Sequence, residues 1–201
     1  MRALVEACRD GRVPLSPALV VSDRPDAPGL AWARAAGVRT ACVDYRALGR
    51  RRGEEQLGAL LEEARPEWIA LAGFMRILGP DIVRAGLGRT VNIHPSLLPR
   101  YPGLDTYRRA LEAGDTEHGS TVHFVDESLD GGPRIARIRV PVRADDDPER
   151  LAARTKAAER QLYPWVLDKL ARGILTWDGA HACRAGKVLD EPVDVTEMFS
   201  G

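Results

Sequence analysis

Short apolar runs alternate with segments of helical spacing along the first half of the chain. The runs cover residues 18–22, 41–43, 68–72 and 90–94. Their length and nearly continuous apolar character are typical of strands buried inside a sheet. The helical segments cover residues 30–36, 54–64 and 81–85, and each is bounded by glycine or proline. Strand and helix in alternation predict an α/β fold with a mostly parallel sheet and helices on both faces.

The pattern changes in the second half. Residues 120–125 and 135–142 flank the turn Gly131-Gly132-Pro133 and predict two longer strands, which we expect to form an antiparallel C-terminal extension. A helix is expected over residues 148–170, with Pro148 in the first turn, where proline is tolerated. The tail after residue 173 is weakly patterned. Because the chain has no repeat and no low-complexity linker, we expect residues 1–201 to form a single domain.

The first residues have helical spacing. Leu4, Val5 and Cys8 would lie on one helix face, so the sequence predicts that the chain begins within a helix. An α/β domain of this kind usually opens with a strand, and the loop after that strand often carries glycines that bind phosphate. Neither element lies upstream of Met1. We therefore expect that an opening strand and a glycine-rich loop are missing from this sequence.

Composition and charge exclude several classes of protein. Basic and acidic residues number 29 each, and the basic residues are scattered, which argues against nucleic acid as a partner. No apolar run approaches the ~18 residues of a membrane helix. The cysteines Cys8, Cys42 and Cys183 lie far apart, without C-x-x-C or a His/Cys cluster at zinc spacing. The sequence predicts a reduced cytoplasmic protein with no metal site and no membrane segment.

Asn92 and His94 are the first candidates for chemistry. Residues two apart in a strand project to the same face, and Pro95 ends the strand directly after His94. The carboxyl ends of strands in open α/β sheets are where ligands bind. An amide and an imidazole there could donate hydrogen bonds to an oxygen that becomes negative during a reaction. The alternative is that both bond to nearby loop backbone, and for an isolated Asn-x-His this structural interpretation is the more common one.

Asp130 and the segment 71–78 also have two interpretations each. Asp130 precedes two glycines and a proline, so it suits a tight turn, but it could also reach His94 and favour the imidazolium form of that ring. Residues 71–78 combine aliphatic side chains with Phe74 and Met75, a mixture that suits core packing or an apolar wall for a flat ligand. For the remaining histidines, His118, His123 and His181, structural roles are favoured.

Four ordered motifs together are more specific than any one of them. They are Phe74-Met75-Arg76-Ile77-Leu78, the run from Asn92 to Leu104 containing His94-Pro95-Ser96-Leu97-Leu98-Pro99, the run His118-Gly119-Ser120-Thr121-Val122-His123-Phe124-Val125, and Leu129-Asp130-Gly131-Gly132-Pro133. This order of motifs closely resembles the folate-dependent phosphoribosylglycinamide formyltransferase family, over residues 1 to about 173. The resemblance implies a Rossmann-like formyltransferase fold.

The resemblance also implies an activity and a set of ligands. The activity is transfer of a formyl group from the co-substrate 10-formyltetrahydrofolate to the amine of glycinamide ribonucleotide in purine biosynthesis, without a metal. The implied small-molecule partner is the substrate glycinamide ribonucleotide, and the implied oligomeric state is a monomer or a weak homodimer. In this family the opening strand lies inside the sheet and its glycine-rich loop binds the ribonucleotide phosphate, which is why we expect a truncated start.

Residue roles follow position by position from the matching motifs. The resemblance implies Asn92, His94 and Asp130 as the catalytic residues. It implies a folate-binding set of Arg50, Met75, Arg76, Ile77, Leu78, Asn92, Asp126, Glu127, Ser128, Leu129 and Asp130, although Arg51 and Arg52 leave the register at Arg50 open. It implies ribonucleotide contacts at Lys156, Ala157, Ala158 and Glu159.

Other functions remain open at this point. A formyltetrahydrofolate deformylase, a methionyl-tRNA formyltransferase or a sugar N-formyltransferase would use the same Asn, His and Asp residues. A deformylase usually carries an additional N-terminal domain, and the tRNA enzyme carries an additional C-terminal domain with a basic surface. A third possibility is a non-catalytic protein that binds folate. A formyl-transfer assay with and without the ribonucleotide distinguishes these functions.

Overall fold

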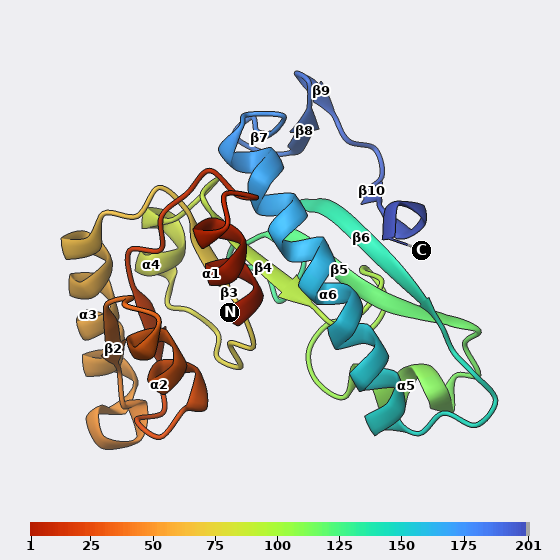
Figure 1. Cartoon of the computed structure of the whole chain (residues 1–201), viewed down its shortest axis with the longest axis horizontal. Helices are drawn as coiled ribbons and strands as arrows, with labels where there is room; N and C mark the ends of the chain where they lie inside the picture. The colour runs from red at the N-terminus through yellow and green to blue at the C-terminus, as the bar shows by residue number, and fades with distance from the viewer. Residues whose placement is uncertain (200–201) are drawn as a thin grey trace.

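The computed structural model describes residues 1–199, and Figure 1 shows the course of the chain. The helices are α1 (Arg2–Arg9), α2 (Pro28–Ala35), α3 (Tyr45–Ala64), α4 (Pro80–Ala85), α5 (Thr106–Glu112), α6 (Pro148–Ala171) and the 3-10 turn η1 (Thr196–Phe199). The strands are β1 (Val20–Ser22), β2 (Thr40–Cys42), β3 (Ile69–Leu71), β4 (Thr90–His94), β5 (Glu117–Phe124), β6 (Arg134–Pro141), β7 (Leu175–Trp177), β8 (Ala182–Arg184), β9 (Lys187–Val188) and β10 (Val193–Asp194).

The strands form three separate sheets within the described residues. The central sheet has the order β10-β6-β5-β4-β3, and a two-stranded parallel sheet, β1-β2, lies apart from it. The antiparallel strands β7, β8 and β9 form the third sheet. In the central sheet β3 pairs in parallel with β4, and β10 with β6, whereas β4, β5 and β6 are antiparallel neighbours. The expectation of a mostly parallel sheet is therefore wrong, and the sheet is mixed.

The reason for the mixed sheet is a hairpin. A short connection that includes Gly131-Gly132-Pro133 joins β5 to β6, and consecutive strands joined without a crossover helix must run antiparallel. The antiparallel pairing expected for residues 120–125 and 135–142 is thus confirmed. Strand β5 begins earlier than expected and is longer, whereas β6 has the expected length, shifted by one residue. They nevertheless belong to the central sheet, and do not form a separate extension from it.

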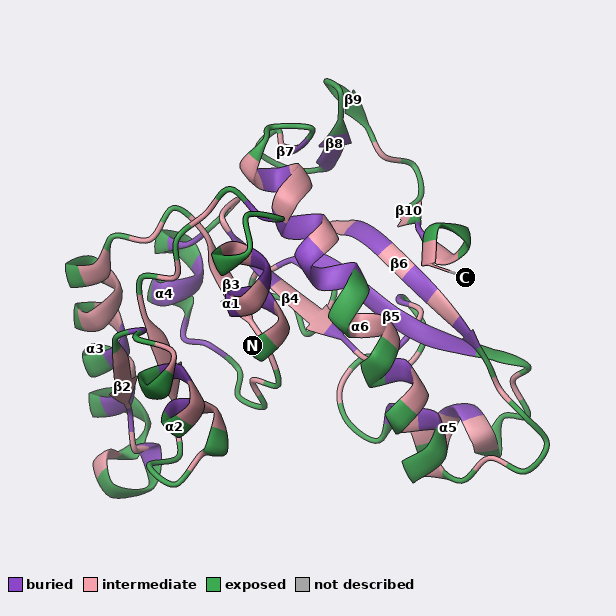
Figure 2. Cartoon of the chain, in the orientation of Figure 1, coloured by how far each residue is buried: buried purple, intermediate pink, exposed green. Residues whose placement is uncertain are grey.

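Helix α6 covers one face of the central sheet (Figure 1). Its start is fixed by Asp147, whose side chain accepts a hydrogen bond from the backbone N–H of Arg150, and by Pro148 in the first turn. Leu162 and Val166 of this helix are fully buried (Figure 2). The buried Tyr163 hydroxyl reaches the carbonyl oxygens of Leu71, at 2.9 Å, and Val91, at 3.0 Å. This side chain therefore ties β3 to β4.

The N-terminal half is packed less completely. Strands β1, β2 and β3 are half-buried along their whole length, and their neighbours form two small apolar clusters that are separate from the main core. Helix α3 begins at Asp44, which caps it through the N–H groups of Arg46 and Ala47, and it bends at Gly49. A cavity of about 470 Å³ lies between this part of the molecule and the central sheet.

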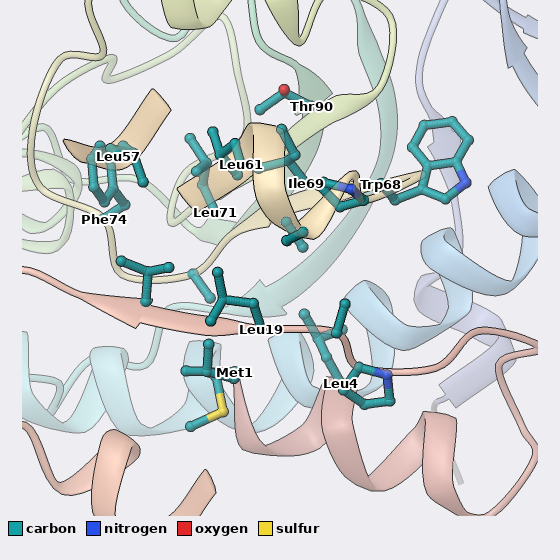
Figure 3. Close-up of a pocket in the computed structure, with 18 of the residues that line it drawn as sticks. Met1, Leu4, Leu19, Leu57, Leu61, Trp68, Ile69, Leu71, Phe74 and Thr90 are labelled. Atoms are coloured by element: carbon teal, nitrogen blue, oxygen red, sulfur yellow. The ribbon is translucent and has the colours of Figure 1, made fainter. Parts of the chain in front are cut away.

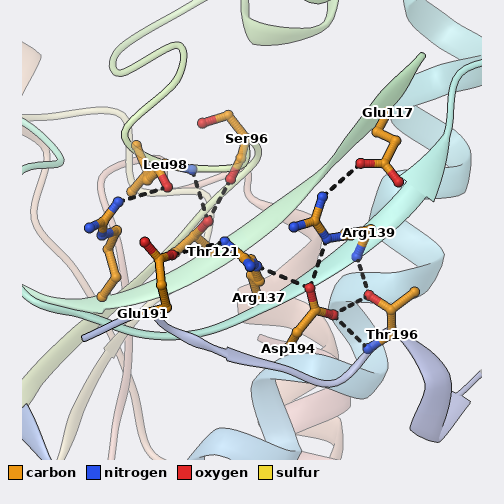
Figure 4. Close-up of polar contacts among 10 residues, drawn as sticks. Ser96, Leu98, Glu117, Thr121, Arg137, Arg139, Glu191, Asp194 and Thr196 are labelled. Atoms are coloured by element: carbon orange, nitrogen blue, oxygen red, sulfur yellow. Dashed lines mark hydrogen bonds and ion pairs between the residues drawn. The ribbon is translucent and has the colours of Figure 1, made fainter. Parts of the chain in front are cut away.

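The C-terminal segment returns to the central sheet through charged contacts (Figure 4). The Asp194 carboxylate accepts hydrogen bonds from Arg137 Nε at 3.0 Å and Arg139 Nε at 2.7 Å, both on β6. It also accepts from the hydroxyl and N–H of Thr196. Burial opposes the charge of Asp194, but these donors outweigh burial and hold its pKa below the usual value. Asp194 thereby fixes β10 against β6.

Most of the expected elements are present. The strand expected at residues 90–94 and the helices expected at 81–85 and 148–170 match within one residue, and the chain does begin in a helix, α1. Helix α5 and the short strands after residue 173 were not expected. Among the described residues, no helix combines the length and the apolar character needed to span a membrane.

Candidate active site

Strand β4 holds Asn92 and His94 on one face. Val91, on the other face, is fully buried in the main core below α6, which leaves the Asn92 and His94 side chains on the face away from that helix. Their register opposite β5 places Asn92 beside His123 and His94 beside Thr121. The expectation that Asn92 and His94 share one face at the carboxyl end of a strand is confirmed.

The His94 ring lies between two hydrogen-bond acceptors. Its Nε2 is 2.9 Å from the carbonyl oxygen of Tyr101, and its Nδ1 is 3.3 Å from Oδ2 of Asp130. A neutral imidazole carries only one N–H, so only the doubly protonated ring donates to both acceptors. The side chain is 6% exposed, which keeps water from replacing either contact. These two contacts and the burial of the side chain hold the His94 ring in one position.

Asp130 is fixed by its backbone as well as by its charge. Its φ of 51° lies in the left-handed region, which asparagine and aspartate tolerate better than most residues. Its Oδ2 accepts a hydrogen bond from the N–H of Gly103 at 2.9 Å. At Gly132 a Cβ atom would lie 2.0 Å from the carbonyl oxygen of Phe124, so only glycine fits the turn after Asp130. The alternative that Asp130 serves the turn alone is wrong, because its carboxylate also reaches His94.

His123 is the second histidine of this cluster, and the sequence pattern had favoured a structural role for it. Its Nδ1 lies 2.8 Å from the carbonyl oxygen of Phe124, which makes Nδ1 the protonated nitrogen of the neutral ring. Its Nε2 then accepts from Nδ2 of Asn92 at 3.2 Å, and lies 3.7 Å from Oδ1 of Asp130. Burial lowers the pKa of His123, in agreement with a neutral ring. The contact fixes which end of the Asn92 amide faces the strand β5.

A signal for His123 was present in the sequence. His123 lies two residues after Thr121, and His94 lies two residues after Asn92, so each pair points to one face of its strand. If the two strands paired directly, the four side chains would share one face of the sheet. The missing information was the pairing of β4 with β5, which depends on the return of the chain through α5. A strand's neighbours cannot be derived from its own pattern.

Three apolar side chains of the expected folate-binding set are exposed. Met75, Ile77 and Leu129 are exposed by 75%, 67% and 58%, whereas Leu78 of the same segment is buried in the cluster beside α3 and α4. Arg76 donates to Asp23 at 2.9 Å, and its guanidinium lies 4.5 Å above the Tyr45 ring. The segment 75–78 is thus anchored by Arg76 and Leu78, and it leaves Met75 and Ile77 exposed.

The other expected ligand residues are more dispersed. In the loop after β5, Asp126 accepts from the N–H and hydroxyl of Ser128, and Glu127 pairs with Arg84 at 3.3 Å on the surface. Arg50 is exposed, directly after the bend at Gly49. Asp126, Glu127 and Ser128 belong to the same loop as Asp130, whereas Arg50 lies on helix α3.

The segment 156–159 lies on α6. Lys156 and Ala157 are exposed, and Ala158 packs against the main core. Glu159 accepts a hydrogen bond from the Ser120 hydroxyl at 2.7 Å, and burial raises the pKa of its carboxyl group. Ser120 precedes Thr121 on β5, so it points to the opposite face of the sheet. The structure therefore brings Glu159 to the face covered by α6, and does not join it to His94 and Asp130.

Comparisons with known proteins agree on one family. The family described as Formyl transferase matches residues 1–167. The chain is 43% identical over 176 residues to a phosphoribosylglycinamide formyltransferase of Escherichia coli strain K12, covering 87% of this chain and 83% of that protein. The corresponding protein of Haemophilus influenzae is 39% identical over 190 residues, with 94% and 90% covered.

A solved structure agrees with the sequence comparison. A phosphoribosylglycinamide formyltransferase from Coxiella burnetii superposes with a TM-score of 0.89 at 39% identity, covering 96% of this chain and 92% of that one. The comparisons do not support the expectation of a truncated start.

Proposed function

The chain belongs to the formyl transferase family, and from this premise we propose that it is a phosphoribosylglycinamide formyltransferase of purine biosynthesis. Its proposed donor is 10-formyltetrahydrofolate, and its proposed acceptor is the amine of glycinamide ribonucleotide. The observation that supports the chemistry most directly is the contact of 3.3 Å between His94 Nδ1 and Asp130 Oδ2, next to the Asn92 amide.

The reaction needs stabilisation of a developing negative charge. The acceptor amine attacks the formyl carbon, and the carbonyl oxygen gains charge. In our proposal the charged His94 ring and the Asn92 N–H that is not bound to His123 donate to this oxygen. The oxygen takes the place of the Tyr101 carbonyl as the acceptor of His94 Nε2–H. The Asp130 carboxylate faces Nδ1 of His94 and holds the ring in place.

The proton balance assigns a second task to Asp130. The amine forms a bond to the formyl carbon and loses a proton, while the bond from that carbon to the folate nitrogen breaks and the nitrogen gains a proton. Asp130 is the carboxylate at the cluster, so it relays this proton in our proposal. The products are the formylated ribonucleotide and tetrahydrofolate, and no oxidant or reductant is consumed.

The remaining expected residues supply binding. We propose that the exposed side chains of Met75, Ile77 and Leu129 cover the flat ring system of the folate. Arg76, Leu78, Asn92 and residues 126–130 would line the rest of the pocket, and Arg50 would meet the charged end of the folate. Lys156, Ala157, Ala158 and Glu159 would contact the ribonucleotide. Burial of an exposed apolar surface is the physical source of folate affinity.

One assay tests the proposal. The purified protein is mixed with 10-formyltetrahydrofolate, with and without glycinamide ribonucleotide, and the appearance of tetrahydrofolate is followed. Formation that depends on the ribonucleotide is the expected result. Formation in its absence would identify a hydrolase and contradict the proposal. If neither mixture reacts while the folate still binds, the protein is a binder and the proposal is wrong.

A further inference from the structure

The segment 73–79, which carries four of the proposed folate-binding residues, joins β3 to α4. It belongs to no helix or strand, so its backbone needs other contacts to hold it in place. The side chains of Phe74 and Leu78 pack in the apolar cluster beside α3 and α4, and Figure 3 shows Phe74 next to Leu57 of α3. The position of this segment therefore depends on contacts with helix α3.

The bend at Gly49 folds the start of α3 back onto the same helix. Gly49 has φ 74° and ψ 170°, outside the helical region. On a straight helix, residues eight apart are separated by about 12 Å along the axis. A Cβ atom at Gly53 would nevertheless lie 2.4 Å from Cδ1 of Tyr45, so the glycine leaves room for the Tyr45 ring. The guanidinium of Arg76 lies 4.5 Å from the centre of that ring. Helix α3 therefore supports Arg76 through Tyr45.

The next residue of α3 holds the end of the segment. Oε2 of Glu54 accepts a hydrogen bond from the backbone N–H of Gly79 at 3.0 Å. Gly79 directly follows Leu78 and is the N-cap residue of α4. A Cβ atom at Gly79 would lie 2.9 Å from the same carboxylate oxygen, so the side chain lies close against the glycine backbone. Two consecutive residues of α3 thus support the segment at two points, Arg76 and Gly79.

The Glu54 carboxylate serves this backbone contact, whereas most acidic groups nearby serve ion pairs. It is half-buried, and within residues 1–199 no arginine or lysine nitrogen lies within 4 Å of it. The neighbouring Glu55, by contrast, is exposed and pairs with Arg51 at 3.4 Å. A hydrogen bond with an ionised acceptor is stronger than one between neutral groups. Glu54 therefore supplies a firm anchor for the N–H of Gly79.

Glu54 also shares a helix face with Arg50. Residues four apart lie on the same side of a helix, and the helical conformation resumes directly after Gly49. Because Glu54 contacts Gly79, this side of α3 is turned toward the segment 73–79. The contact therefore relates the position of Arg50 to that of the segment, and these are two parts of the proposed folate-binding set that lie on different elements.

We infer that Glu54 is a positioning residue for the folate, whose carboxylate fixes the backbone of the segment 73–79 against α3 and thereby sets the affinity for 10-formyltetrahydrofolate. The inference rests on the proposed function. A segment that is already ordered loses little conformational freedom when the ligand binds, so loosening it weakens binding. Glu54 acts through the N–H of Gly79 and not on the reacting atoms. The KM for the folate therefore depends on Glu54, whereas kcat at saturating folate does not.

Three substitutions at this position separate reach from charge. Glu54→Ala removes the acceptor and should raise the KM for 10-formyltetrahydrofolate about fivefold, the value of one hydrogen bond, with kcat unchanged. Glu54→Asp keeps the charge but is one methylene shorter, so we expect the same rise. Glu54→Gln keeps an oxygen acceptor at the same reach and should stay within about twofold of the wild type. Glu62→Ala, at an exposed glutamate of the same helix, is the control.

The opposite order of effects would overturn the inference. If Glu54→Asp behaves as the wild type and Glu54→Gln is impaired, the charge matters and the contact with Gly79 does not. A fall in kcat with an unchanged KM for the folate would also contradict a positioning role. If Glu54→Ala fails to fold, the comparison of Glu54→Asp with Glu54→Gln carries the test.

Hydrogen exchange measures the anchor without any folate. The Gly79 amide should exchange at least about tenfold faster in Glu54→Ala than in the wild type or in Glu54→Gln, because hydrogen-bonded amides exchange only after opening. Equal exchange in the three proteins would overturn the inference.

Equilibrium dialysis with 10-formyltetrahydrofolate separates this inference from the proposed function. A wild type that binds the folate but transfers no formyl group contradicts the proposed function, and the binding comparison still tests Glu54. Equal folate binding by the wild type and Glu54→Ala contradicts the inference alone. A wild type that binds no folate contradicts both.

Discussion

The two halves of the molecule differ in how completely their strands are buried. In the central sheet Val91 and Val122 are fully buried below α6, and the same strands hold Asn92, His94 and His123 on the opposite face. In the N-terminal half β1, β2 and β3 are only half-buried, and β1 and β3 border the cavity of about 470 Å³. The proposed catalytic side chains therefore lie in the half of the molecule whose strands are more completely buried.

The proposed ligand segments lie on the other half. Arg50 follows the bend in α3, and Met75–Leu78 follows β3. Both therefore depend on elements that line the cavity of the N-terminal half. The Tyr163 hydroxyl of α6 lies within hydrogen-bond distance of carbonyl oxygens on both β3 and β4, so it ties β3 to the better-packed strands. Chemistry requires sub-ångström placement, whereas an apolar ligand surface tolerates adjustment.

The strongest test of the rigid half is His94→Ala. We expect the rate of formyl transfer to fall by at least about 100-fold, because a charged donor to the developing oxyanion is lost. The measurement is steady-state kinetics on folded protein, with His181→Ala as the control, since His181 is exposed in the C-terminal segment and bonds to Asp178. Retained turnover in His94→Ala would remove His94 from the mechanism.

A pair of core truncations compares the packing directly. Leu162→Ala, in the fully buried core, should lower the free energy of unfolding by about 3 kcal/mol. Leu61→Ala should lower it by about 1 kcal/mol only, because Leu61 already borders the cavity. Urea unfolding measures both. Equal losses would show that the two halves are packed alike and would break the comparison.

Asp130→Asn examines the charge at constant shape. We expect about 30-fold slower formyl transfer, since the neutral amide beside His94 cannot relay a proton. The variant keeps the backbone conformation, because asparagine also accepts the left-handed region. Asp126→Asn, in the same loop, is the matched control with an expected change of less than about threefold. A similar loss in both would point to the loop, and away from the carboxylate.

His123→Leu sharpens the distinction between touching the substrate and positioning Asn92. Loss of the acceptor for Asn92 Nδ2 should lower kcat about tenfold and leave KM for the ribonucleotide unchanged, since the amide can then rotate. Because burial lowers the pKa of His123, the wild type should also lose stability as the pH falls below about 6.5, and this loss should be absent in the variant. A rise in KM with unchanged kcat would contradict the positioning role.

The smallest expected effect concerns the C-terminal contact. Asp194→Asn should cost about 1 kcal/mol of unfolding free energy at pH 7, because its hydrogen bonds from two arginines lose their charge. The folded-state pKa of Asp194 is lowered, so its contribution is present above the unfolded value of about 4 and lost as the pH falls below it. Thermal unfolding at pH 7 and pH 3 measures this. Asp190→Asn, which is exposed nearby, should change neither value.

Local patterns predicted the elements but not their neighbours. Strand β4 was predicted residue for residue, because Thr90–His94 combines buried positions with a proline directly after it. Helix α3 is longer than expected, since its first turns carry Arg50, Arg51 and Arg52 and the bend at Gly49 and show no apolar stripe. The short strands β7 to β10 depend on tertiary pairing, so their own composition gives no signal.

The candidate site was predictable where sequence separation was small. Asn92 and His94 share a face by strand geometry alone, and Asp130 was open between turn and charge partner until its distance to His94 was known. His123 was missed because its contact with Asn92 depends on the pairing of β4 with β5. The roles of these residues stay predictions until the variants are measured.

The left-handed backbone at Asp130 has a consequence for which residues can replace it. Few side chains tolerate a φ of 51°, and those with short polar groups or none at all tolerate it best. Glutamate, the nearest chemical homologue, tolerates the left-handed backbone less well than aspartate, and its side chain is one methylene longer. Its carboxylate would therefore not lie where that of Asp130 lies. A saturation library at this position should therefore retain folded protein mainly with asparagine and glycine, and a selection for activity should return aspartate alone.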